Sequence, residues 1–198
     1  MDNWIKQRDM KKRITYNSPV ILTFAAVSLV ALILNALTGG ISNKLLFAVY
    51  RSSPLNPLTY IRIFGHVLGH ADFGHYFGNM MYFLLLGPAI EEKYGSSDTL
   101  LMIAATAIIT GLVNMILFPN TALLGASGVV FCFIVISSMT GFKNGNIPLT
   151  LILVVILYLG QEVYSAIFVA DNVSQLTHIL GGIVGCAFGF LSKKVENK

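Results

Sequence analysis

The chain has 198 residues, of which 55% are hydrophobic and 11% are charged, and its formal net charge is +4 at pH 7. An ordinary soluble domain carries about 25% charged residues, so this composition excludes a soluble globular fold. A helix needs roughly 20 apolar residues to cross a bilayer, which limits the chain to six or seven spans. We therefore expect one compact, all-α, polytopic membrane domain.

The positive charge is concentrated ahead of the first apolar run. Five basic residues precede Pro19, namely Lys6, Arg8, Lys11, Lys12 and Arg13. Basic residues beside a span mark its cytoplasmic side, so this placement indicates a topology signal and argues against nucleic acid as a partner. The run from 19 to 37 has the length of a span and lacks a small-residue cleavage site. We expect residues 1 to 18 to form a cytoplasmic segment before a retained anchor.

Six apolar runs follow one another along the chain, separated by short polar or Gly/Pro/Asn-containing stretches. They cover residues 19 to 37, 73 to 90, 99 to 118, 123 to 142, 147 to 169 and 174 to 192. If the N-terminus lies inside, only Lys44, Arg51 and Arg62 among the 13 Lys and Arg lie outside. The pattern predicts six transmembrane helices within 19 to 192, and a cytoplasmic tail, 193 to 198, that places both termini inside.

The long connection from 38 to 72 mixes glycines, prolines and apolar patches. We expect it to be an ordered external segment at the membrane interface. The two cysteines, Cys132 and Cys186, both lie in apolar stretches and indicate buried thiols rather than a disulfide framework.

Four polar residues occur at one depth of the predicted bundle. Spans two, four and six all run from outside to inside, so the distance of a residue from the start of its span measures its depth. His75 and Asn79 lie in the first turns of span two, and Ser127 and His178 each lie about one turn into spans four and six. Polar side chains are expensive inside a membrane, so a group of them indicates a functional site or a water-filled cavity.

Ser127 lies between glycines, in the sequence Gly125-Ala126-Ser127-Gly128. A serine hydroxyl becomes a good nucleophile when a base takes its proton, and His178 is the base available at this depth. The flanking glycines let a substrate backbone approach without a Cβ clash. No Asp or Glu lies at this level of spans two, four or six, which favours a Ser-His dyad over a triad.

The same region offers donors for a negatively charged oxygen. The first backbone N–H groups of a helix have no partner within that helix. His75 and Asn79, one helical turn apart, could add side-chain donors, each stabilising a transition state by about 3 kcal/mol. Glycines at 181, 182, 185 and 189 follow His178 at helical spacing, so another helix can approach on the histidine's own face.

Together these residues resemble the rhomboid family of intramembrane serine proteases over nearly everything from span two to span six. The resemblance rests on His66-x3-His70-x4-His75-x3-Asn79 with Gly87-Pro88-Ala89-Ile90-Glu91, on Gly125-Ala126-Ser127-Gly128, and on His178 with Gly181 and Gly185. It implies a rhomboid-like bundle of six transmembrane helices. It also implies that Ser127 is the nucleophile and His178 the general base and acid. His75, Asn79 and the Ser127 amide would then form the oxyanion hole.

Gly125, Gly128, Phe131, Gly181 and Gly185 would support this site. Two positions depart from the family pattern: Ile61-Arg62 stands where many relatives have Trp-Arg, and Phe131 where a tyrosine often stacks beneath the catalytic histidine. We expect these departures to affect the anchoring of the long first loop and the rate of cleavage more than the catalytic chemistry of the Ser-His dyad.

The resemblance further implies cleavage of transmembrane segments near the outer leaflet, with no metal or other cofactor. The expected partners are transmembrane protein substrates and the lipid bilayer. The compact chain favours a bacterial plasma membrane as its location.

Three other functions compete with this interpretation. His66, His70 and His75 have spacing that could suit zinc, but no His-Glu-x2-His occurs and a metal site leaves the serine motif unexplained. A non-catalytic rhomboid-like protein that binds membrane clients typically lacks the serine or the histidine, and both occur here. A transporter or channel is disfavoured because the polar residues cluster at one shallow level and do not line a path through the membrane. Glu162, in span five, is expected to face a cavity or a neighbouring helix.

Overall fold

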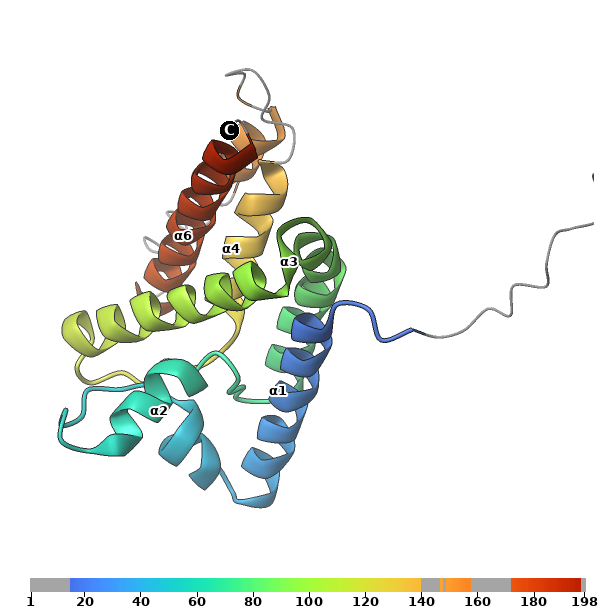
Figure 1. Ribbon diagram of the computed structural model, residues 1–198. Coiled ribbons are helices and arrows are strands. Elements are labelled where there is room, and N and C mark those ends of the chain that lie inside the picture. Colours follow the sequence, from blue (N-terminus) through green and yellow to red (C-terminus); the bar gives the residue numbers. More distant parts are fainter. Residues whose placement is uncertain (1–14, 140–146, 148, 158–171, 197–198) are drawn as a thin grey trace, which may run out of the picture.

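The computed structural model describes residues 15 to 139, 147, 149 to 157 and 172 to 196. Its helices are α1 (Pro19–Leu37), the π-helix η1 (Asn43–Phe47), α2 (Pro57–Gly65), α3 (Phe73–Leu117), α4 (Ser127–Ser138) and α6 (Asn172–Glu196), with further helical residues from 149 to 157. Among the described residues the one β feature is an isolated bridge between Val49 and Leu123. The prediction of an all-α helical bundle is confirmed (Figure 1).

Helix α1 coincides with the first predicted apolar run, and a carboxylate holds its N-terminus. The first N–H groups of a helix lack partners within the helix and carry partial positive charge. The Val20 and Ile21 amides donate to the two carboxylate oxygens of buried Glu91 at 3.1 Å each. The Ser96 hydroxyl donates to the same carboxylate at 2.6 Å. Glu91 therefore fixes the start of α1 against α3.

The second and third predicted spans both lie within α3, which is broken at Gly95. Gly95 has φ 82° and ψ 162°, a conformation that favours glycine and divides α3 into two helices. Figure 1 shows the two halves running at a large angle to each other. The predicted end of span two near residue 90 is too early, because the helix continues through Pro88 until Gly95.

Helix α4 begins at Ser127, four residues later than the apolar run from 123 predicted. The preceding residues are not helical, and a β-bridge at Leu123 holds them. Val49 and Leu123 exchange two backbone hydrogen bonds of 2.9 Å, and the Asn114 amide donates to the carbonyls of Val49 and Thr121 at 3.1 Å each. Ser127 is therefore the first residue of its helix and does not lie one turn inside it.

The segment from 38 to 72 is ordered, as predicted, and buried Arg62 anchors it. The Arg62 Nε donates to the Leu45 carbonyl at 3.0 Å, and its guanidinium lies 4.5 Å from the centroid of the Tyr50 ring. The neighbouring Ile61 side chain is half exposed. The Arg62 guanidinium makes both of these anchoring contacts, and neither contact requires an aromatic residue at position 61.

The last two predicted spans are described in part. Residues 149 to 157 are helical, and the remainder of span five, including Glu162, lies outside the described residues. Helix α6 begins at Asn172 and continues to Glu196, beyond the predicted end at 192. The helix continues past residue 192 into polar sequence. Lys and Glu have good helix propensity, so a polar stretch need not end a helix.

Candidate functional site

The backbone around Ser127 is built by a glycine and a helix start. Gly125 has φ 128°, in the region that favours glycine, and its amide donates to the His66 carbonyl at 2.9 Å. Ala126 is the N-cap of α4 and makes no side-chain capping hydrogen bond. The first N–H groups of α4 therefore lie beside the half-buried Ser127 without a capping side chain.

His75 and Asn79 reach this backbone from the first turns of α3. Asp72 caps α3, with its carboxylate accepting from the His75 amide at 2.8 Å. A Cβ atom at Gly125 would lie 2.8 Å from His75 Nε2 and 3.7 Å from Asn79 Nδ2. Two side-chain nitrogens therefore border the residue two positions before Ser127, and any larger residue at 125 would collide with the imidazole.

Asn79 is buried, and its amide nitrogen has no hydrogen-bond partner among the described residues. A buried amide donor without a partner is costly, so native proteins rarely keep one without a reason. This nitrogen is available to a ligand oxygen that enters the site.

His178 approaches from α6 and stacks on α4. Its ring lies parallel to the Phe131 ring, with 4.1 Å between the centroids and 4° between the planes. Phe131 is one helical turn after Ser127, so the stack sets the imidazole against the first turns of α4.

Helix α6 reaches the α4 backbone through its glycines. A Cβ at Gly181 would overlap the Gly128 carbonyl oxygen, and one at Gly185 would lie 2.5 Å from the Cys132 carbonyl oxygen. A Cβ at Gly182 would meet the Val135 side chain at an ordinary 3.5 Å. Gly181 is one turn after His178, so this contact brings the part of α6 that carries His178 to Gly128, the residue after Ser127.

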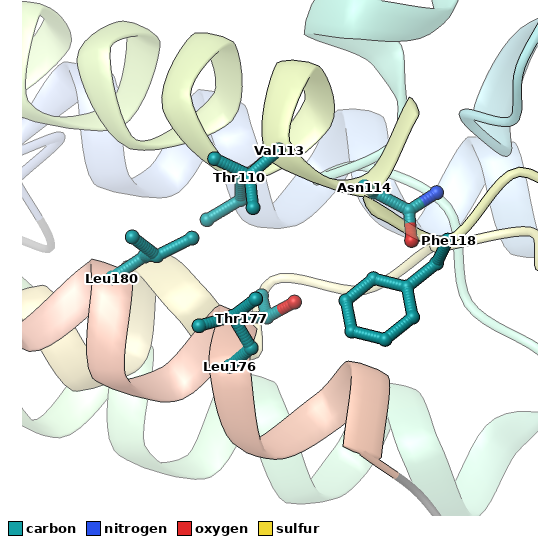
Figure 2. A pocket seen from close by; sticks show the side chains of 7 residues that line it. All are labelled: Thr110, Val113, Asn114, Phe118, Leu176, Thr177 and Leu180. Atoms are coloured by element: carbon teal, nitrogen blue, oxygen red, sulfur yellow. The ribbon is translucent and has the colours of Figure 1, made fainter. Parts of the chain in front are cut away.

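A narrow crevice lies between the second half of α3 and α6 (Figure 2). A Cβ at Gly128 would lie 3.1 Å from Thr177 Cγ2 and 3.5 Å from Thr110 Cγ2. The crevice has no room for a water molecule. Its walls are formed by Thr110, Val113, Asn114, Phe118, Leu176, Thr177 and Leu180. The crevice is therefore a packing seam that holds the two helices on either side of the serine backbone.

His66 and His70 hold the segment from 38 to 72. His66 Nδ1 pairs with the Ile63 carbonyl at 2.9 Å and its Nε2 with the Thr110 hydroxyl at 3.1 Å. His70 Nδ1 pairs with the Leu68 carbonyl at 3.1 Å. Burial lowers the pKa of each imidazole to about 4. Both nitrogens of His66 have protein partners, which leaves neither of them for a metal.

The pKa of His66 leads to a prediction about stability. Its pKa falls from 6.5 to about 4 on folding because burial disfavours the charged ring. The unfolded chain therefore binds more protons between these values, and the stability present above pH 6.5 is lost as the pH falls toward 4. We expect up to about 1.4 kcal/mol per pH unit from this residue. Detergent unfolding at several pH values should show a shallower slope in His66→Gln. Equal slopes in both proteins would contradict this account.

The structural roles of Glu91 and Asn114 were not predicted from the sequence, although Glu91 ends one of the motifs on which the family resemblance rests. Glu91 binds the start of α1, and Asn114 joins residues 49 and 121. Each of these polar residues lies inside or beside an apolar run, which indicates that it needs a hydrogen-bond partner. The sequence does not show which residue, about 70 positions away, is that partner.

The fold and this cluster define an all-helical protein with long apolar helices, in which a serine, a histidine and two further nitrogen-bearing side chains gather near the starts of three helices. Residues 57 to 194 match the family profile described as the Rhomboid domain. The chain belongs to the rhomboid family and is an integral membrane protein.

Similar proteins carry the same family name. The chain is 27% identical to Rhomboid protease GlpG of Haemophilus influenzae, over 68% of this chain and 71% of that protein. It is 29% identical to Rhomboid-related protein 2 of Mus musculus, over 68% of this chain and 51% of that protein. It is 25% identical to Rhomboid protease GluP of Bacillus subtilis, over 92% of this chain and 37% of that protein. The chain thus spans about half the length of the mouse relative that it matches.

Proposed function

We propose that this protein is an intramembrane serine endopeptidase that cleaves transmembrane segments near the outer leaflet by a Ser127-His178 dyad. One observation carries the proposal. Gly125 lies against the His75 and Asn79 nitrogens, while the His178 ring stacks on the helix that Ser127 begins. This arrangement supports the proposal that Ser127 as nucleophile, His178 as base, and His75 and Asn79 as oxyanion donors act at one site.

In the proposed reaction, His178 takes the Ser127 hydroxyl proton as the oxygen attacks the scissile carbonyl. The carbonyl oxygen becomes an oxyanion, which accepts hydrogen bonds from the Ser127 amide, His75 and Asn79. Collapse breaks the peptide C–N bond, and His178 gives its proton to the leaving amine. Water then attacks the acyl-enzyme with His178 again as base, releasing the carboxylate product and restoring the serine. No metal or other cofactor takes part.

The proposed substrates are transmembrane proteins, which would be cut within a membrane-spanning segment. A peptide bond inside a helix is shielded by its own hydrogen bonds, so the substrate must unwind before Ser127 can reach the carbonyl. Segments weakened by Gly or Pro near the outer leaflet should therefore be cut faster than leucine-rich ones. Equal cleavage of both kinds would contradict this specificity.

We further propose a plasma-membrane protein with both termini in the cytoplasm. A cytoplasmic segment (1 to 18) would precede a six-span protease domain (19 to 192), followed by a cytoplasmic tail (193 to 198). Lys and Arg outside the described residues carry much of this assignment. Protease accessibility of tags placed at each end of the chain, in sealed vesicles, would test it.

The test of function is reconstitution of the purified chain with a synthetic single-span substrate that carries a Gly-Pro pair near its outer end. Mass spectrometry of the products should show one cut inside the span. Binding of the substrate without any cut would favour a non-catalytic client-binding protein instead.

Asn79→Ala tests the oxyanion assignment. The Asn79 amide nitrogen makes no hydrogen bond among the described residues, so its removal should cost the fold little. Loss of one transition-state donor should lower kcat about 100-fold with little change in KM. Unfolding of the variant in detergent provides the control for stability. An unchanged kcat in a folded variant would remove Asn79 from the oxyanion hole.

A further inference from the structure

We propose that Gln175 holds the water that hydrolyses the acyl-enzyme, with its side-chain oxygen accepting a hydrogen bond from the water while His178 takes the water's proton. The proposal rests on the protease function proposed above and assigns a residue to the second half of that reaction. The Gln175 side chain is 7% exposed, and its Oε1 has no hydrogen-bond partner among the described residues. A buried acceptor without a protein partner needs an explanation, and an ordered water or a catalytic role is the usual one.

Gln175 lies on the face of α6 that carries His178 and packs against α4. It is three residues before His178 and seven before Gly182, and residues at these spacings share a helix face. A Cβ at Gly182 would meet the Val135 side chain of α4 at 3.5 Å. The Gln175 and His178 side chains are therefore both on the α4 side of α6.

Helix α4 begins too late to cover Gln175. The two helices run in the same direction, because Gly181 of α6 approaches Gly128 and Gly185 approaches Cys132. Gln175 is six residues before Gly181, or about 9 Å along the helix axis, whereas α4 starts just one residue before Gly128. The amide therefore lies beyond the start of α4, where that helix has no residue to pair with its oxygen.

The imidazole of His178 leans toward the turn that carries Gln175. Helical side chains point back toward the N-terminus of their helix, and Phe131 covers one face of the His178 ring from α4. The Cβ atoms of residues three apart on a helix are about 5–6 Å from each other. One water molecule can therefore contact both the Gln175 amide and the imidazole.

The second half of the proposed reaction needs a water in this place. In the acyl-enzyme, the substrate carbonyl carbon is bonded to Ser127 Oγ. The water oxygen attacks that carbon as His178 takes one proton, and the remaining O–H donates to Gln175 Oε1. The bond from carbon to Oγ then breaks, His178 returns the proton to Oγ, and the carboxylic acid product leaves.

Deacylation can be measured separately from peptide cleavage. The purified full-length chain would be acetylated at Ser127 with p-nitrophenyl acetate, and intact mass spectrometry would follow the loss of the acetyl group. A misplaced reactant can slow a reaction about 100-fold, so we expect deacetylation to be slower by about this factor in Gln175→Leu. Labelling of Ser127 by a fluorophosphonate does not use this water and should keep its wild-type rate.

Gln175→Glu is the matched variant, because it keeps an oxygen acceptor at the same position and should restore most of the deacetylation rate. Gln175→Leu replaces an unpaired buried amide with an apolar side chain, so its thermal unfolding in detergent should show at least wild-type stability. Wild-type deacetylation in Gln175→Leu, or equally slow deacetylation in both variants, would overturn the proposal. Fluorophosphonate labelling that falls as much as deacetylation would assign Gln175 to both halves of the reaction and also overturn it.

These outcomes are separable from the protease function. Slow deacetylation in Gln175→Leu with normal labelling would support the water site even if the wild-type chain cut no transmembrane substrate. Cleavage of such a substrate by the wild-type chain, with equal deacetylation in wild type and Gln175→Leu, would reject the water site and leave the protease in place.

Discussion

Cleavage of a single-span substrate is expected to fall by at least about 1,000-fold in Ser127→Ala and in His178→Ala. The serine supplies the oxygen that forms the acyl-enzyme, and without the histidine its proton has no acceptor at that depth. The initial rate of product formation in proteoliposomes measures the effect.

The two residues should act as a unit, so Ser127→Ala combined with His178→Ala should be no slower than either single variant. Ser137→Ala is the matched control, because Ser137 lies on the same helix but lines a cavity at its other end. A Ser127→Ala protein that kept a tenth of the wild-type rate would exclude serine catalysis at this residue.

Gly181→Val is expected to abolish activity by separating α6 from α4. A Cβ at this position would overlap the Gly128 carbonyl oxygen, a backbone atom that cannot rotate away. Overpacking of a core typically costs 1–3 kcal/mol, and we expect about 3 kcal/mol here because the clash is with backbone. Thermal unfolding in detergent and the rate of substrate cleavage should both show the loss.

Gly182→Ala is the matched control, because its Cβ would make an ordinary contact with Val135 at 3.5 Å. Its stability should lie within about 1 kcal/mol of wild type. A Gly181→Val protein as stable and active as Gly182→Ala would show that close approach of the two helices is not required.

The all-α fold could be predicted because apolar runs of span length leave few other structures possible in a membrane. The limits of α1 agree with the first run. The end of span two was placed too early because the apolar run stops at the charged residues Glu91, Glu92 and Lys93, whereas the helix continues to the break at Gly95. A proline within a membrane helix is tolerated where neighbours compensate for the lost hydrogen bond, and a sequence does not show those neighbours.

The set of site residues could be proposed because spans two, four and six share a direction, so depth can be estimated by counting. The position of Ser127 was wrong by about a turn because an apolar run does not distinguish a helix from an extended segment. The non-helical form of 118 to 126 depends on hydrogen bonds of Leu123 with Val49 and of the Gly125 amide with the His66 carbonyl, and both partners are distant in sequence. The catalytic roles of Ser127 and His178 remain predictions.

The central claim is an activated serine, and labelling with a fluorophosphonate tests it most directly because it needs no known substrate. Detergent-purified protein would be treated with the probe, and mass spectrometry would locate the modified residue. The account predicts modification at Ser127 that is lost in both Ser127→Ala and His178→Ala. Folded wild-type protein that stays unlabelled, or labelling at Ser127 that persists in His178→Ala, would contradict it.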